Sequence, residues 1–162
     1  MHAQNAFLMW LPAKSAVQEK WLTTCARRAG SNRMKKELDP RHVFRKGIIQ
    51  ALYSKTFEHT SAPPLSAKQK SICKDIEKHQ KDINAIIDTY ATTFDHTKMA
   101  KVDYAILQQG VYELLFTDKA EPYKVVIDEA VELAKEYGSD SSSKLVNGIL
   151  AKAYSDHATS EQ

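Results

Sequence analysis

The chain has 162 residues, 43% of them hydrophobic, which suits one domain or two small helical halves sharing a core. Its net charge of +3 is concentrated at the start, because residues 1–33 hold five basic residues and one acidic residue, leaving −1 on residues 34–162. A nearly neutral body argues against massive, non-specific nucleic-acid binding. No uninterrupted apolar run of about 18 residues occurs, so no membrane-spanning helix is expected and a cytoplasmic location is favoured.

Residues 1–33 are interpreted as a disordered extension, because the short apolar run AFLMWLP has no basic residue before it and is marginal as a secretory signal. Met34 is the expected natural start of a domain that reaches residue 155, followed by a flexible tail at 156–162. Cys25 and Cys73 lie far apart, without His or Cys at ligand spacing, which argues against a zinc site or a disulfide framework. No metal or cofactor is therefore expected.

The first predicted helix begins at Asp39 and Pro40, an N-cap followed by a residue suited to the first helical turn. It runs to about Phe57 and places on one face Phe44, Ile48, Ala51 and Leu52. Arg41 and Arg45 are four residues apart and share one edge. Cations at a helix N-terminus oppose the macrodipole, so this placement favours an anionic ligand nearby. The alternative is an ordinary solvated helix start.

A polar segment with two prolines, 58–65, separates this helix from a second predicted helix, which spans Ser66 to about Phe94. Its apolar face contains Ile72, Ile76, Ile83, Ile87, Tyr90 and Phe94. The lysines on its other side alternate with acidic residues and are interpreted as a solvated face. Neither His79 nor His96 has a partner at metal-ligand spacing, so no metal role is assigned to them.

Three more helices are predicted between Val102 and Leu150. The first, to Phe116, is apolar on most sides and is expected in the core. The second runs from Pro122 to Tyr137 and stops at Gly138, which suits a left-handed C-terminal cap. The third follows a Ser/Asp-rich start and turns inward Leu145, Val146, Ile149 and Leu150. Two short connections between three helices predict a compact all-α bundle.

We find no arrangement typical of an active site: no glycine-rich phosphate loop, no His–carboxylate metal motif and no activated Ser or Cys. An acidic group on the predicted helix after Pro122 is interpreted as its solvated side rather than as general acids: Asp128, Glu129, Glu132 and Glu136. These observations favour a binding protein over an enzyme.

The sequence resembles the NusB family of bacterial transcription antitermination factors. The resemblance is carried by VDYAILQQGVYELLF, PYKVVIDEAVELAKEYG and SKLVNGIL in that order, preceded by RHVFRKGIIQALYSKTF, and it covers Arg41 to Leu150. It implies an all-α bundle of the NusB type. It also implies binding to boxA RNA in the leaders of ribosomal RNA operons, as a heterodimer with the ribosomal protein NusE, so that RNA polymerase reads through terminators.

Eight residues match positions that the resemblance implies for RNA binding: Arg41, His42, Arg45, Lys46, Tyr123, Lys124, Lys144 and Asn147. Arg45 and Lys124 are assigned to phosphates. Tyr123 is assigned to base stacking or a phosphate hydrogen bond, with packing under the turn as the alternative. Asp103 matches the acidic edge that faces NusE in the family, although the helix dipole alone also favours an aspartate in a first turn.

Two departures from the family pattern leave alternatives open. The first helix has fewer arginines than is typical, and Leu145 stands where an aromatic residue is common, which removes a stacking platform. A helical adaptor that kept the fold but lost RNA binding is therefore a second hypothesis. A third is a relative of the helical module at the N-terminus of ribosomal RNA cytosine methyltransferases, which would need a further cofactor-binding domain.

Overall fold

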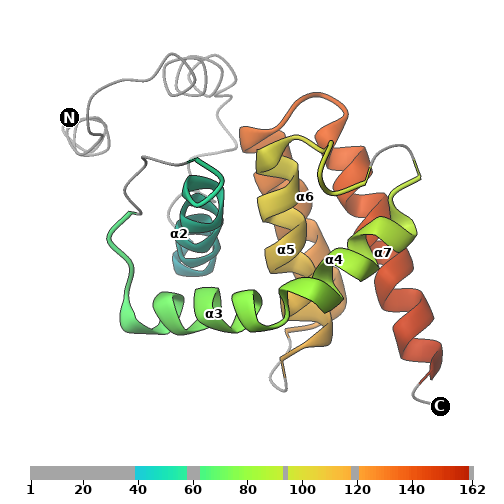
Figure 1. The fold of residues 1–162 in the computed structure, drawn as a ribbon, viewed down its shortest axis with the longest axis horizontal. Helices are drawn as coiled ribbons and strands as arrows, with labels where there is room; N and C mark the ends of the chain where they lie inside the picture. The colour runs from blue at the N-terminus through green and yellow to red at the C-terminus, as the bar shows by residue number, and fades with distance from the viewer. Residues whose placement is uncertain (1–38, 58–62, 93–94, 118–120, 161–162) are drawn as a thin grey trace.

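This computed structural model describes residues 39–57, 63–92, 95–117 and 121–160, and all their regular structure is helical (Figure 1). The helices are α2 (Pro40–Ser54), α3 (Ala67–Lys78), α4 (Gln80–Tyr90), α5 (Lys101–Leu115), α6 (Tyr123–Tyr137) and α7 (Ser142–Ser160). The prediction of an all-α fold is confirmed. The expected extension 1–33, the start at Met34 and Cys25 lie outside the described residues. None of the described helices is long and apolar enough to cross a membrane.

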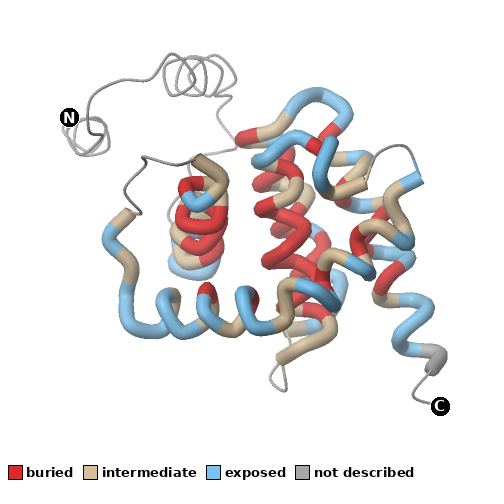
Figure 2. Tube along the Cα trace, in the orientation of Figure 1, coloured by how far each residue is buried: buried red, intermediate tan, exposed pale blue. Residues whose placement is uncertain are grey.

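Helix α5 is the centre of the bundle, as its apolar pattern predicts. It packs against α2, α3, α4, α6 and α7, and α4 also contacts α7, so the two halves share one core (Figure 1). Ten of its fifteen residues are buried, and Ala105, Leu107 and Val111 have no exposed surface (Figure 2). A helix buried on most sides offers little surface to a solvent-borne ligand, so candidate sites are expected mainly on the helices around it.

Gly110 allows α5 and α7 to approach closely, because a Cβ there would lie 2.8 Å from Leu150 Cδ1. Leu150 is fully buried and has little room to move. We expect Gly110→Ala to lower the free energy of unfolding by about 1–2 kcal/mol, as overpacking outweighs the gain in helix propensity. Urea denaturation measures this change.

Gly148 provides the matched control for that substitution. It also lies inside a helix, but nothing lies within 4 Å of a Cβ built there. Gly148→Ala should leave stability unchanged or raise it by up to about 1 kcal/mol. Equal destabilisation by both substitutions would contradict the close approach at Gly110.

Side-chain caps set the beginnings of α2 and α3. The Asp39 carboxylate accepts a hydrogen bond from the Arg41 N–H (2.9 Å), and Pro40 occupies the first turn, which confirms the predicted start of α2. Ser66 and Gln69 form a capping box at α3. The Gln69 amide also donates to the Phe44 carbonyl (2.9 Å), which ties α3 to α2.

The single long helix predicted from Ser66 to Phe94 is wrong in detail, because α3 and α4 are separated at His79. His79 has φ −93° and ψ 12°, outside the helical range, and its ring Nδ1 lies 2.9 Å from the Asp75 carbonyl oxygen. Its ring also packs 4.8 Å from that of Phe116. The break does not disturb the apolar face, since Ile76 and Ile83 on its two sides are fully buried. Phe94 lies outside the described residues.

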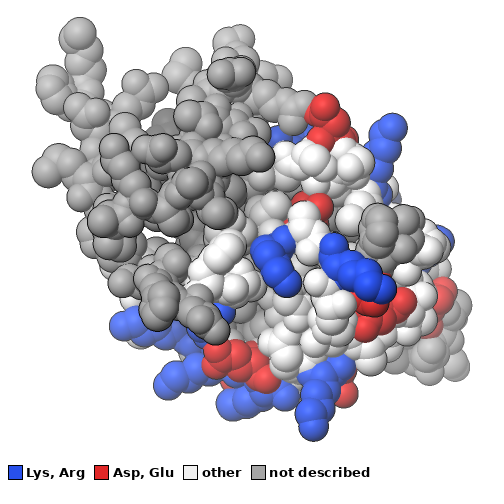
Figure 3. Space-filling view, turned by 45° about the horizontal axis from the view of Figure 1, so that its top comes forward, with Lys and Arg blue, Asp and Glu red and all other residues white. Residues whose placement is uncertain are grey.

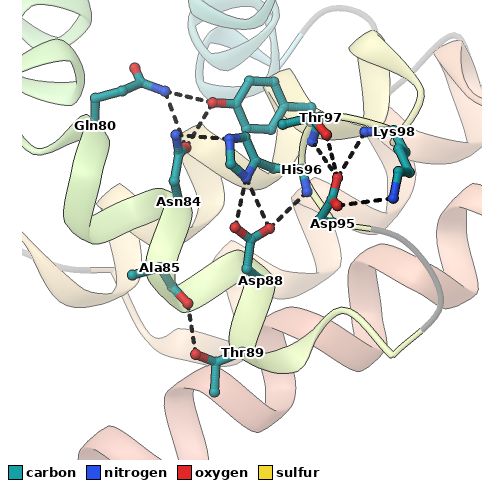
Figure 4. A network of polar contacts seen from close by, with 10 residues as sticks. Gln80, Asn84, Ala85, Asp88, Thr89, Asp95, His96, Thr97 and Lys98 are labelled. Atoms are coloured by element: carbon teal, nitrogen blue, oxygen red, sulfur yellow. Dashed lines mark hydrogen bonds and ion pairs between the residues drawn. The ribbon is translucent and has the colours of Figure 1, made fainter.

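His96 belongs to a polar network that joins α4, the 95–98 turn and α5 (Figure 4). Its Nδ1 lies 2.7 Å from Asp88 Oδ2, and its Nε2 lies 3.3 Å from the Asn84 amide nitrogen. The Tyr104 hydroxyl donates to Asn84 (2.7 Å) and accepts from Gln80 (2.6 Å). Neighbouring polar groups therefore satisfy the imidazole, and its arrangement indicates a structural role in holding the turn.

Two further expectations about helix ends are corrected. α6 stops at Gly138 as predicted, but the glycine has φ −92° rather than the left-handed conformation. A glycine is needed here for space, because a Cβ would lie 2.5 Å from the Ser142 side chain. The tail expected to be flexible from residue 156 continues α7 to Ser160. Cys73 is a free, buried thiol, as its helical position predicts.

Candidate nucleic-acid interface

Arg45 lies at the junction of α2 with α5 and α6. Its side chain is only 7% exposed. The guanidinium binds both oxygens of Glu113, with Nε donating over 2.9 Å, and Nη2 also donates to Glu121 Oε2 over 2.9 Å. Burial alone would lower the pKa of Arg45, but the hydrogen bonds and charges of Glu113 and Glu121 raise it above its ordinary value. This guanidinium is therefore buried and held by two carboxylates, and its predicted contact with phosphate stays a prediction.

His42 lies one turn earlier on α2 and is also buried. Its Nδ1 lies 3.0 Å from Glu129 Oε2 and its Nε2 lies 3.1 Å from Glu136 Oε2. Carboxylates only accept hydrogen bonds, so the imidazolium, which donates from both nitrogens, is the form that satisfies this site. The hydrogen bond to Glu136 raises the pKa of His42 most, burial opposes the rise, and Glu129 adds to it. His42 is therefore a structural cation rather than an exposed RNA contact.

Lys46 binds the same glutamate of α6 as His42. Its ammonium group donates to Glu136 Oε1 over 3.1 Å and lies 5.1 Å from the centre of the Tyr137 ring. Although burial opposes it, the hydrogen bond from His42 and the charge of Lys46 help lower the pKa of Glu136 to about 2. His42 and Lys46 of α2 thus bind carboxylates on one face of α6.

The prediction that the acidic residues of α6 form only its solvated side is wrong for two of them. Asp128 is exposed and Glu132 pairs with Lys135 near the surface, as expected. Glu129, however, is buried, and Glu136 is largely covered. A sequence signal exists in retrospect, because Glu129 and Glu136 are seven residues apart and share a face with Leu133, in the core.

Arg41 is more exposed than the other cations of α2, His42, Arg45 and Lys46. Its side chain is 68% exposed, and its Nη1 lies 3.4 Å from Glu121 Oε1. Glu121 stands directly before Pro122, the N-cap of α6, so this contact brings the N-terminal turn of α2 to the N-terminus of α6. Two segments that are 80 residues apart in the sequence therefore meet at one corner of the molecule.

Two tyrosines form a stacked pair at the same end of α6. Tyr123 is 38% exposed, and its ring stacks on that of Tyr154 from α7, with centroids 4.2 Å apart and an interplanar angle of 12°. Lys124 is exposed, and its Nζ lies 5.9 Å from the centre of the Tyr123 ring. The sequence analysis missed Tyr154, since only the antiparallel packing of α6 and α7 places it here. Arg41, Tyr123, Tyr154 and Lys124 are called the aromatic-basic corner below.

The remaining predicted residues lie elsewhere. Lys144 and Asn147 are exposed one turn apart on α7, toward the end of that helix away from Tyr154. Asp103 is 5% exposed and accepts a hydrogen bond from the Ser142 hydroxyl (2.9 Å), while that hydroxyl accepts from the Ser139 N–H (2.8 Å). Burial raises the pKa of Asp103. The prediction of an exposed acidic edge at Asp103 is corrected, because its carboxylate joins the start of α5 to the start of α7.

The surface charge is mixed. On the face drawn in Figure 3, lysine and arginine side chains are interspersed with aspartate and glutamate and separated by uncharged surface. Among the described residues, no three His, Cys, Asp or Glu side chains gather as metal ligands. Fold and site together define a small all-helical domain with an exposed aromatic-basic corner. The other cations of α2, His42, Arg45 and Lys46, are paired with carboxylates of the protein itself.

Comparisons identify the family of this domain. The NusB family model matches residues 44–155, so the chain belongs to the NusB family. A transcription antitermination protein NusB from Anaeromyxobacter dehalogenans (strain 2CP-1) is 38% identical over 115 residues, which are 70% of this chain and 79% of that protein. One from Agathobacter rectalis is 50% identical over 80 residues, 49% of this chain and 60% of that protein. The chain thus spans less than two thirds of this second relative.

Solved structures share the fold. A structure of T. maritima NusB has a TM-score of 0.65 and 32% sequence identity, and the match covers 75% of this chain and 95% of that one. A structure of the antitermination factors NusB and NusE in complex with dsRNA has a TM-score of 0.58, covering 72% of this chain and 96% of that one. At 22% identity, this second likeness concerns the fold alone.

Proposed function

We propose that this protein is a transcription antitermination factor that binds boxA-like single-stranded RNA together with NusE and acts in the cytoplasm by binding rather than catalysis. Membership of the NusB family supports this role, and its curated relatives carry the name transcription antitermination protein NusB. A structural neighbour contains NusB and NusE in complex with dsRNA. For this chain, the complex would act on RNA polymerase to promote readthrough of ribosomal RNA operons.

The aromatic-basic corner is the observation that carries the RNA-binding part of the proposal. Single-stranded RNA is bound by cations that contact phosphates and by flat side chains on which bases stack. Arg41 and Lys124 offer exposed cations, and the Tyr123–Tyr154 stack is partly exposed between α6 and α7. Lys144 and Asn147 extend the proposed RNA path along α7. His42, Arg45 and Lys46 hold α2 against α5 and α6 and thereby position Arg41.

An RNA titration tests the proposal. Fluorescence anisotropy with a boxA-like RNA and a scrambled control, with and without NusE, should show a preference for boxA that NusE strengthens. Lys124→Ala should weaken binding to both RNAs and reduce the slope of log K against log salt by about 0.7, the value for one lost contact to a single-stranded phosphate. Lys81→Ala removes an exposed lysine of α4 and should leave binding unchanged.

A helical adaptor without RNA binding is the second candidate function. It is favoured by one observation: all four α2 cations are paired with carboxylates of α5, α6 or the segment between them, and three of them, His42, Arg45 and Lys46, are also largely buried. The same titration separates the two candidates. Equal affinity for boxA and scrambled RNA in the presence of NusE would favour the adaptor.

A further inference from the structure

The two arginines of α2 converge on the two oxygens of one carboxylate. Arg41 Nη1 lies 3.4 Å from Glu121 Oε1, and Arg45 Nη2 donates to Glu121 Oε2 over 2.9 Å. Phosphate presents several oxygens to adjacent guanidinium groups in the same way, and paired N–H···O contacts of this kind are typical of arginine–phosphate recognition. Glu121 therefore occupies a position whose donors suit a phosphate.

Arg45 has two carboxylate partners, Glu113 and Glu121. Glu113 already binds both Nε and Nη2 of Arg45 and is itself a neutralising partner. The cluster of two arginines and two glutamates has a formal charge of zero, and without Glu121 it would carry +1. Among the described atoms, Arg45 Nη1 is buried and has no hydrogen-bond partner, so this guanidinium keeps one unused donor.

The surroundings of Glu121 also favour an anion. It stands immediately before the N-terminus of α6, a helix of 15 residues, where the macrodipole favours negative charge. Pro122, the N-cap, provides no side-chain hydrogen bond to the first N–H groups of α6. Tyr123 and Lys124, in the proposed RNA corner, follow within three residues of Glu121.

We propose that Glu121 is an internal competitor of RNA: its carboxylate holds the Arg41–Arg45 site until an RNA phosphate displaces it. This inference rests on the proposed function and assigns a regulatory residue to its RNA site. The exchange replaces one anion by another on the same donors, so an isolated phosphate gains little from it. An RNA that also contacts Tyr123 and Lys124 gains from those additional contacts. Glu121 thus suppresses non-specific binding and makes occupancy of the site depend on a matching strand.

Glu121→Gln tests the competition while keeping the size of the side chain and the adjacent Pro122. Without the carboxylate, affinity for both boxA-like and scrambled RNA should rise by roughly threefold to tenfold, the scale of a partly exposed ion pair. The slope of log K against log salt should steepen by about 0.7. In the variant the two arginines neutralise one further phosphate whose counterions are released, and no carboxylate has to be displaced. The ratio of the affinities for boxA-like and scrambled RNA should decrease.

Glu132→Gln is the matched control. It removes a carboxylate that is also ion-paired on α6, with Lys135 Nζ at 2.8 Å, and it changes the net charge by the same amount. A general charge effect would raise RNA affinity equally in both variants and would contradict the inference. Thermal unfolding of both variants confirms that each is folded at the assay temperature.

The outcomes separate the inference from the function on which it rests. If wild-type protein prefers boxA RNA and Glu121→Gln leaves affinity and salt slope unchanged, Glu121 is only a structural partner of the arginines and the competition is excluded. If neither protein prefers boxA over scrambled RNA with NusE present, the proposed function fails, and the competitor role fails with it.

Discussion

Arg45→Met should lower the free energy of unfolding by about 3 kcal/mol, at the lower end of the cost of breaking a buried ion pair from one side. Methionine keeps much of the volume of the side chain but leaves Glu113 and Glu121 without their shared cation. Both glutamates retain some access to solvent, with 21% and 29% of their side chains exposed, which limits the loss. Equilibrium denaturation at pH 7 measures it.

Arg41→Met is the control for that substitution. Arg41 has the same charge and contacts the same Glu121, but its side chain is 68% exposed, so its pair contributes no more than about 1 kcal/mol. Arg41→Met should therefore have the smaller effect on stability. Its effect on RNA affinity should be direct, because the exposed guanidinium of Arg41 is lost. If Arg45→Met kept full stability and lost only RNA affinity, the phosphate contact predicted from the sequence would be right and the structural role of Arg45 would be wrong.

The stability of the protein should depend on pH through His42. Its pKa is raised above its ordinary value of 6.5 in the folded state, so its contribution is fully present below pH 6.5 and is lost as pH rises through the folded value. Deprotonation leaves one ring nitrogen without a proton opposite a carboxylate, Glu129 or Glu136. The free energy of unfolding should therefore fall as pH rises above 6.5.

Glu136 has the opposite sign. Its folded pKa is about 2, below its ordinary value of 4.5, so its contribution is present above pH 4.5 and is lost as pH falls toward 2. Together the two groups place maximal stability of this cluster between pH 4.5 and pH 6.5. Lys46 also donates to Glu136, over 3.1 Å, and helps hold its carboxylate in place.

His42→Gln tests this assignment. Glutamine cannot carry the positive charge, so we expect it to cost about 3 kcal/mol near pH 6 and less at high pH, where wild-type His42 is neutral. His157→Gln, which changes an exposed histidine of α7, should keep the wild-type pH profile. A stability profile that is flat between pH 6 and pH 9 in the wild type would contradict the role of His42.

Much of the fold follows from local sequence. The apolar period identifies α5 as the core helix, and Asp39 and Ser66 mark the starts of α2 and α3 as predicted. Caps and periodicity depend on neighbours within four residues, so they can be read without knowing the fold. The break at His79 was not predicted: its ring contacts that of Phe116, which follows the end of α5, and no local pattern marks the break between α3 and α4.

The candidate site was predicted less completely. Family resemblance selected both Arg41 and Arg45 on α2, although one is exposed and the other is buried. Their positions on one helix edge are equivalent in sequence, and only the packing of α5 and α6 distinguishes them. Tyr154 had no signal of its own, because its stacking on Tyr123 requires α6 and α7 to lie antiparallel.

The sequence by itself determined an all-helical chain, the identity of its central helix and the residue types available for binding an anionic strand. Only the tertiary structure decided which of those charges face the solvent. Arg45 meets Glu113 and His42 meets Glu136 across 68 and 94 residues of chain, respectively. Charges act through space and burial removes the water that screens them, so the partners and exposure of each charged group are settled when the helices pack.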